Sequence, residues 1–202
     1  MTPNAIQQLV EHFSTLPGIG PRQATRFVYF LLKQEPGKIK AFGDAIGNLQ
    51  TSISLCEECF LPHEDICAIC TDPKRKHTTV CVVEKESDAL RLEKAGIYNG
   101  RYFVLGGTVG ALMQQSSAKE RITILKKLVE SGNVEELILG LNPTREGTFT
   151  SSYIEKVLSP PEGWSGQTKK PRITRLGRGL TTGAELEYVD EDTLRSAFEG
   201  RK

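Results

Sequence analysis

The chain has 202 residues, of which 38% are hydrophobic and 25% charged, a composition typical of a soluble globular domain with room for a small extra module. It contains no long apolar run and no basic, apolar leader at its start, so we expect neither a membrane span nor a signal peptide. The formal net charge of +1 does not decide for or against a nucleic-acid partner.

The first quarter of the chain is predicted to be helical. Apolar residues recur at helical spacing over residues 4–15 and again over residues 21–33, where Pro21 suits a first helical turn. The segment 16–21 between them is too rich in glycine and proline to continue a helix. A third helix is expected over residues 38–54, so this part forms a helical hairpin followed by one more helix.

The turn of this hairpin reads Leu-Pro-Gly-Ile-Gly, which is typical of a helix-hairpin-helix motif. Gly18 and Gly20 permit backbone angles that side chains would block, so a phosphate can approach the turn. The second helix presents its free N–H groups and positive dipole end there. Arg22 and Arg26 are four residues apart and therefore share a face beside that helix end. These four residues predict a site for the DNA backbone; an ordinary hairpin with solvated arginines is the alternative.

Four of the five cysteines form one C-x2-C-x7-C-x2-C cluster, made of Cys56, Cys59, Cys67 and Cys70. Two C-x2-C pairs supply four thiolates, a shell that suits Zn²⁺ and leaves no position for a catalytic water. We therefore expect one structural Zn²⁺ ion per chain; two disulfides or four unrelated thiols are the alternatives. His63 lies inside the loop and could replace a thiolate, whereas Cys81 lies in an apolar run and should be a small buried side chain. Zinc thiolates without a secretion signal fit a reducing cytoplasm.

From residue 79 onward, predicted strands alternate with predicted helices. Strands are expected at residues 80–83, 102–105, 137–141 and 172–176, and helices at residues 87–94, 119–131 and 150–158. Such alternation predicts an α/β fold with right-handed crossovers and a mainly parallel sheet. The other segments are interpreted as a loop at 159–163, a late strand at 185–189 and a short helix at 194–198.

Two clusters of basic residues stand out, at residues 74–76 and 169–178. Runs of this kind are usually solvated surface. A second surface for a polyanion is the competing interpretation.

Two of the predicted strands end at polar residues, Glu84 and the segment 142–147. Open parallel sheets bind their ligands beyond the carboxyl ends of the strands. This arrangement resembles the Toprim fold of topoisomerases, primases and some nucleases, in which a glutamate and a D-x-D-x-x-G motif hold Mg²⁺. Glu84 matches the glutamate and Gly147 the glycine, whereas Asn142 and Thr144 stand where the two aspartates would be.

The missing aspartates change the chemistry that we expect. Mg²⁺ needs carboxylates to offset its charge and partial dehydration, and Glu84 and Glu146 are the acids that remain. Two-metal strand cleavage then lacks ligands, and Tyr153 on the following predicted helix has no evident activating base. We therefore expect no catalytic residue. A Mg²⁺-dependent Toprim nuclease or primase-like enzyme that uses Glu84 and Glu146 is the alternative.

The order of hairpin, cysteine cluster, degenerate Toprim region and basic C-terminal segment resembles the RecR family of bacterial recombination mediators over essentially the whole chain. The resemblance rests on the cysteine cluster and on residues 16–21, 80–84, 100–105 and 142–147. It implies a non-enzymatic DNA-repair protein that acts with RecO and RecF to load RecA at gapped or single-stranded DNA. It also implies DNA contacts at Arg22 and Arg26, a homo-oligomer that is a dimer or ring-shaped tetramer, and a cytoplasmic, nucleoid-associated location.

The resemblance divides the chain into four regions: a helix-hairpin-helix region (1–54), a four-cysteine zinc finger (55–78), a Toprim domain (79–170) and a C-terminal segment (171–202). It implies that Glu84 and Glu146 lie where the family binds RecO. The C-terminal segment should pack on the Toprim domain or on a neighbouring subunit. Two places depart from the family pattern: Thr148 replaces the usual acid, and residues 179–186 lack the usual proline.

Overall fold

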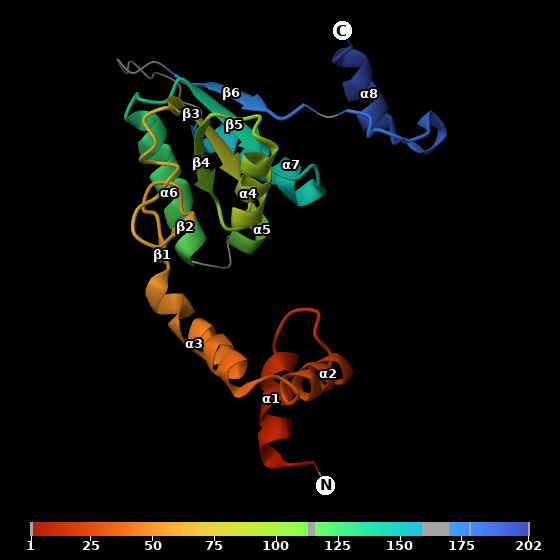
Figure 1. Ribbon diagram of the computed structural model, residues 1–202. Coiled ribbons are helices and arrows are strands. Elements are labelled where there is room, and N and C mark those ends of the chain that lie inside the picture. Colours follow the sequence, from red (N-terminus) through yellow and green to blue (C-terminus); the bar gives the residue numbers. More distant parts are fainter. Residues whose placement is uncertain (1, 113–115, 159–169, 178, 202) are drawn as a thin grey trace. The chain divides into compact units, whose positions relative to one another are not determined.

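The computed structural model describes residues 2–112, 116–158, 170–177 and 179–201 (Figure 1). The chain forms two compact units, Met1–Ile53 and Ser54–Lys202. Within the described ranges, no helix is both long enough and apolar enough to span a lipid bilayer.

The first unit consists of three helices, α1 (Asn4–Ser14), α2 (Pro21–Leu31) and α3 (Pro36–Ser52). α2 begins with Pro21 in its first turn. The carbonyl of its N-cap residue, Gly20, accepts hydrogen bonds from the Gln23 and Ala24 amides. α1 packs on α2 through an edge-to-face contact of Phe13 with Phe27, whose ring centroids are 6.0 Å apart. Ala24 and Val28 on α2 are buried, whereas α1 and α3 bury no residue. The core of this unit is therefore small.

The second unit is built on a parallel four-stranded sheet in the order β4-β3-β5-β6. The strands are β3 (Lys76–Val83), β4 (Gly100–Val104), β5 (Glu136–Gly140) and β6 (Arg172–Arg175). Val83 at the end of β3 lies opposite Val104 on one side and Gly140 on the other. The ends of the two central strands therefore lie side by side, and the predicted parallel sheet is confirmed. Two short antiparallel strands, β1 (Ser54–Leu55) and β2 (Pro62–His63), precede it.

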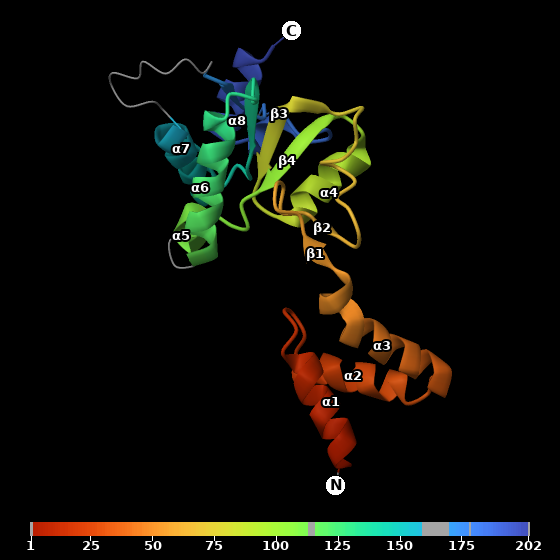
Figure 2. The same ribbon diagram turned by 90° about the vertical axis from the view of Figure 1, so that its left-hand side faces the viewer.

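Both faces of this sheet are covered. Figure 2 shows α6 (Ser116–Glu130) and α7 (Arg145–Leu158) on one side of the sheet and α4 (Glu86–Ala95) on the other. Val80 and Val82 on β3 belong to the core on the side of α6 and α7, whereas Cys81 and Val83 belong to the core on the side of α4. Strands with two buried faces need continuous apolar runs, which explains the run in β3. Cys81 is 2% exposed, so it is the small buried side chain that we predicted.

The C-terminal part differs from the sequence prediction. The late strand expected at 185–189 is wrong, because Leu186–Tyr188 forms a single 3-10 turn. Its alternating apolar residues imitate a strand, but Leu186 and Tyr188 are exposed and pack on no sheet. The last helix, α8 (Glu191–Glu199), begins earlier than predicted because the Asp190 side chain caps it by accepting from the Thr193 amide.

Three more findings complete the comparison. α7 begins five residues earlier than predicted, at Arg145, and the short helix α5 (Val109–Leu112) was not predicted. The loop expected at 159–163 lies outside the described residues. The four region boundaries stay a prediction, whereas the α/β fold with helices at the N-terminus and a mainly parallel sheet is confirmed.

Candidate functional site

The four cysteines converge as their spacing predicts. Cys56 and Cys59 lie between β1 and β2, Cys67 and Cys70 lie between β2 and β3, and all four sulfurs are within 4.8 Å of one another. Two sulfur pairs, Cys56–Cys70 and Cys59–Cys67, are 3.8 Å and 3.5 Å apart. A disulfide would need about 2.0 Å, whereas tetrahedral Zn–S bonds of about 2.3 Å place sulfurs about 3.8 Å apart. The side chains are therefore positioned to bind a metal ion and are not paired as disulfides.

Hydrogen bonds favour a thiolate at Cys59. Its pKa is lowered to about 5, because Cys70 donates to its sulfur and this effect, with a bond from the Leu61 amide, outweighs burial. Burial raises the pKa of Cys67, although the Ile69 and Cys70 amides donate to its sulfur. Amide N–H groups that point at sulfur offset the charge of a metal-bound thiolate. The donor set therefore fits Zn²⁺, and His63 is not part of it.

The turn that carries Cys56 and Cys59 is docked on the edge strand β4. The Val104 amide of β4 donates to the Cys59 carbonyl at 3.0 Å. The next residue, Phe60, has a positive φ of 61° and packs edge-to-face on Phe103, with ring centroids 5.3 Å apart. The Arg121 guanidinium of α6 lies 4.5 Å from the Phe60 ring centroid and donates to the Val104 carbonyl at 3.2 Å. These contacts fix the cysteine turn to the sheet.

One arginine of the 74–76 cluster and two arginines of the 169–178 cluster form ion pairs. Arg75, in the middle of the 74–76 run, donates two hydrogen bonds to the Glu93 carboxylate, at 3.0 Å and 2.5 Å. The Tyr102 hydroxyl donates to the same carboxylate at 2.7 Å. Hydrogen bonding from Arg75 lowers the pKa of Glu93. Among the described residues of the C-terminal cluster, Arg172 pairs with Glu136 and Arg175 pairs with Glu155. Lys74, Lys76 and Lys170 are exposed, which agrees with the interpretation of these runs as solvated surface.

The structure brings together Glu84 and Asn142, as their places at the ends of β3 and β5 predict. The Asn142 amide donates to a Glu84 carboxylate oxygen at 3.0 Å. The Lys85 ammonium lies 3.8 Å from the other oxygen, and Glu84 is only 9% exposed. The Asn142 amide therefore takes up one oxygen of Glu84, and the Lys85 ammonium offsets part of its charge. Across the described residues, the cysteine cluster is the only group of three or more His, Cys, Asp or Glu side chains placed to hold a metal.

The segment after Asn142 closes tightly into α7. The Thr144 hydroxyl accepts from the Gly147 amide at 3.1 Å and so caps the start of the helix. A Cβ atom at Gly147 would lie 2.0 Å from the Asn142 carbonyl oxygen, so only glycine fits. Glu146 is exposed to solvent in the first turn of α7. Thr144 thus stabilises the helix start in place of binding a cation.

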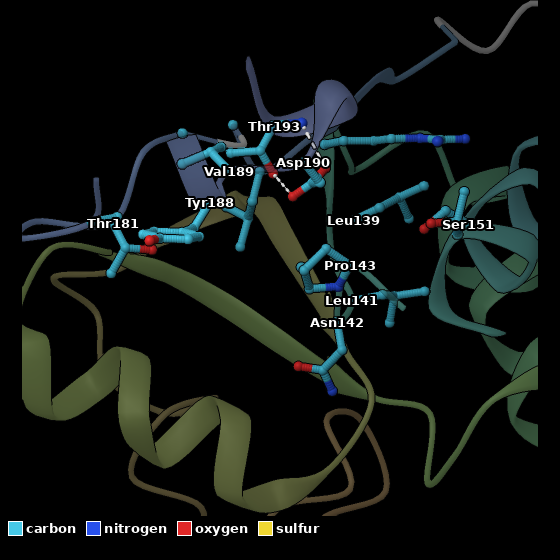
Figure 3. Close-up of a pocket in the computed structure, with 17 residues that line it drawn as sticks. Leu139, Leu141, Asn142, Pro143, Ser151, Thr181, Tyr188, Val189, Asp190 and Thr193 are labelled. Carbon is cyan, nitrogen blue, oxygen red and sulfur yellow. Dashed lines mark hydrogen bonds between the residues drawn. The ribbon is translucent and has the colours of Figure 1, made fainter. Parts of the chain in front are cut away.

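A cavity of about 630 Å³ borders this segment. Figure 3 shows Leu141, Asn142 and Pro143 on one side of it, and Tyr188 and Asp190 of the C-terminal segment on another. Both Asp190 carboxylate oxygens accept from Thr193, through its amide and its hydroxyl. The cavity therefore lies between the end of β5 and the C-terminal segment, and the Asp190 carboxylate that lines it also caps α8.

At the hairpin, Gly18 has the left-handed conformation that favours glycine, whereas Gly20 has a φ of −86° and a ψ of 165°, which any residue can adopt. Gly18 has a φ of 79°, in the left-handed region, and nothing within 4 Å would meet a Cβ atom at Gly18 or Gly20. The turn is therefore open to a ligand. Arg22 and Arg26 are exposed, and no ion pair involving either is seen in the described parts of the chain.

Sequence reasoning missed Phe60, Arg121 and Glu93. Phe60 gave a signal, because a large aromatic residue directly after the second cysteine is poorly suited to a solvated turn. Arg121 and Glu93 gave none, because their partners are distant in sequence and are brought near only by packing of α6 and α4 on the sheet.

Comparison with known proteins agrees with this architecture. Family models described as "RecR, helix-hairpin-helix", "Toprim domain" and "RecR, C-terminal" match residues 6–49, 78–165 and 182–202. A protein of Bifidobacterium animalis subsp. lactis named "Recombination protein RecR" is 38% identical over 98% of this chain and 96% of its own length. Proteins of the same name from Dehalococcoides mccartyi and Chloroflexus aurantiacus are 37% and 39% identical, over 100% and 98% of this chain and 95% and 93% of their own lengths.

Proposed function

The chain belongs to the RecR family of recombination proteins, and from that premise we propose that it is a non-enzymatic, DNA-binding recombination mediator. It acts in recombinational DNA repair with RecO and RecF and helps to load RecA at gapped or single-stranded DNA. It works in the cytoplasm, in association with the nucleoid. The observation that carries the proposal is the open glycine turn of the hairpin beside two exposed arginines.

DNA binding rests on Gly18, Gly20, Arg22 and Arg26. The open turn lets a phosphate reach the backbone amides, and the N-terminus of α2 adds the positive end of its dipole. Arg22 and Arg26 extend this anion site along one face of α2. Contacts with phosphates carry no sequence information, so the protein should select DNA by its structure and not by its sequence.

The absence of catalysis is supported by the end of the sheet. The Asn142 amide donates to the Glu84 carboxylate from a position where the Toprim motif has an aspartate, so Glu84 lacks that partner acid for a divalent cation. If the protein is instead a Mg²⁺-dependent nuclease or primase-like enzyme, incubation of labelled DNA with Mg²⁺ or Mn²⁺ will give turnover that Glu84→Ala abolishes. We expect no turnover with the wild type.

We assign the same region, Glu84 and Glu146, to binding of RecO. Glu146 is exposed and can contact a partner directly, whereas Glu84 holds the segment that presents it. Glu146→Ala should weaken binding of RecO in a titration calorimeter and leave the unfolding temperature unchanged. Unchanged affinity would remove Glu146 from the partner surface.

The metal at the cysteine cluster is Zn²⁺, one ion per chain, and its role is structural. Four protein thiolates leave no open ligand position, and the surrounding amides support their charge. Metal analysis of protein purified without chelators should find one zinc per chain. Cys67→Ser should lose the metal and destabilise the region, because metal binding and local folding are one equilibrium.

Two apolar faces support a homo-oligomer. α3 buries no residue, and an apolar stripe along it is exposed: Ile39, Phe42, Ile46 and Leu49. The C-terminal segment also exposes large apolar side chains: Leu186, Tyr188 and Phe198. Each face can be covered by the same face of a second copy. Two different two-fold contacts per chain would close a dimer of dimers, the ring-shaped tetramer, and one would give a dimer.

The decisive experiment measures binding to gapped DNA as a function of salt. Arg22→Ala with Arg26→Ala removes two phosphate contacts, so affinity should fall and the salt slope should decrease by roughly two units. Lys126→Ala with Lys127→Ala on α6 removes the same charge elsewhere and is the matched control. Unchanged affinity and slope in the arginine variant would reject the hairpin as the DNA surface.

A further inference from the structure

α2 carries an aromatic residue within its row of cations. Arg22, Arg26 and Tyr29 are spaced four and three residues apart, which places them along one face of α2, and Lys33 follows four residues later in the turn after the helix. The buried residues Ala24 and Val28 lie at other positions of the helix. Tyr29 therefore lies between Arg26 and Lys33 in this row, which we call the cationic stripe.

The cationic stripe is exposed and no acid lies within it; the first acid after it, Glu35, pairs with Lys38. Tyr29 is 49% exposed, and Arg22, Arg26 and Lys33 are exposed as well. Residues 12–34 contain no aspartate or glutamate. The charge of the stripe therefore complements a polyanion and not a basic or neutral partner.

We propose that Tyr29 is a base-stacking residue, and that it makes this surface prefer DNA with unpaired bases, such as the single strand at a gap, over continuous duplex. The inference rests on the proposed DNA-binding function of the hairpin and names the feature of DNA that the hairpin selects. The arginines and Lys33 hold phosphates on both sides of the ring, and the ring takes the face of a base that is exposed between them.

The preference follows from what each form of DNA presents. Duplex DNA turns phosphates and sugars outward and keeps the faces of its bases stacked inside, so an aromatic ring beside the phosphate contacts gains little there. A single strand exposes the faces of its bases, and proteins that bind single strands combine a cationic groove with aromatic stacking platforms. A tyrosine set among cations has this combination. Stacking tolerates any base, in agreement with phosphate contacts that read no sequence.

A role in self-association is the competing explanation, because the first unit exposes other apolar side chains. In the apolar stripe of α3, apolar residues follow one another at helical spacing, as expected of a surface for self-association. Tyr29 differs, because the residues at helical spacing from it are cations, three residues before it and four residues after it. Burial of Tyr29 against a second copy would bring two rows of like charge together, which is unfavourable.

The test compares two DNA ligands and three variants of the full-length protein. Affinity is measured for a gapped duplex and for a continuous duplex of equal length, and the mass in solution is measured by light scattering. Tyr29→Leu keeps an apolar side chain but removes the ring, Tyr29→Phe keeps the ring, and Arg22→Ala with Arg26→Ala removes the phosphate contacts.

We expect Tyr29→Leu to bind gapped DNA roughly 5- to 100-fold more weakly, the range for loss of one stacked base, with duplex affinity and salt slope unchanged. Tyr29→Phe should bind as the wild type does. The inference is overturned if the wild type does not prefer the gap, if Tyr29→Leu keeps its preference, or if its affinity for both ligands falls together with a change in mass. If the wild type shows no salt-sensitive DNA binding at all, the proposed function itself fails, which is a distinguishable result.

Discussion

Removal of the Phe60 side chain should test how the cysteine turn is held on the sheet. Phe60→Ala removes an aromatic pair with Phe103, worth about 1 kcal/mol. It also removes a cation–π contact with Arg121, worth about 0.5–1 kcal/mol. Loss of partial apolar burial adds about 1–2 kcal/mol. We therefore expect the free energy of unfolding to fall by about 3 kcal/mol in total.

The backbone at Phe60 makes a second variant informative. A φ of 61° costs a residue with a Cβ atom about 1 kcal/mol, and glycine avoids that cost. Phe60→Gly removes the same ring, yet it should be about 1 kcal/mol less destabilising than Phe60→Ala. In the interior of a helix, by contrast, a substitution by glycine would be more destabilising than one by alanine.

The assay is urea unfolding of the zinc-loaded protein, followed by circular dichroism and by release of zinc to a coloured chelator. Phe149→Ala is the matched control, because this phenylalanine on α7 is 63% exposed and should change stability by less than about 0.5 kcal/mol. Equal or greater destabilisation by Phe60→Gly than by Phe60→Ala would refute the reasoning from the left-handed backbone. A loss below about 0.5 kcal/mol in Phe60→Ala would refute the docking role.

Three further predictions concern the second unit. Arg75 lowers the pKa of Glu93 in the folded state. The stability that this pair contributes is therefore fully present above the unfolded pKa of about 4.3 and is lost as the pH falls through the lower folded pKa. In Glu93→Gln, the unfolding temperature should fall less on acidification than in the wild type. Gly147→Ala should lower the unfolding temperature by several degrees, because its Cβ would meet the Asn142 carbonyl at 2.0 Å; an unchanged temperature would contradict the close packing. Asn142→Asp should place a second acid beside Glu84, so Mg²⁺ should raise the unfolding temperature of this variant and not of the wild type; equal shifts would contradict the role of Asn142.

Much of the fold is local and was therefore open to prediction. The alternation of apolar runs with helical periodicities predicted the four parallel strands, because strands such as β3 and β4, which bury both faces, need continuous apolar runs. The cysteine spacing gave the cluster, since a C-x2-C turn brings its two sulfurs together with little help from the rest of the chain. The same local logic failed at 185–189, where two alternating apolar residues have no sheet to pack on.

The candidate sites also differ in whether nearby or distant residues in the chain define them. Gly18, Gly20, Arg22 and Arg26 lie in one turn and the first helical turns after it, so the proposal of an anion site there needs only their spacing in the sequence. The role of Asn142 depends on its place across the sheet. Only the pairing of β3 with β5 shows that its amide bonds to Glu84.

By itself the sequence determined most of the elements, the clustering of the four cysteines and the missing Toprim acids, because each is set by residues a few positions apart. The tertiary structure decided how these parts are joined and which charges are available. It placed Phe60 between Phe103 and Arg121, and it committed Arg75 to Glu93 and not to the surface. Those contacts join residues far apart in the chain, and their energies depend on packing and burial that no local spacing encodes.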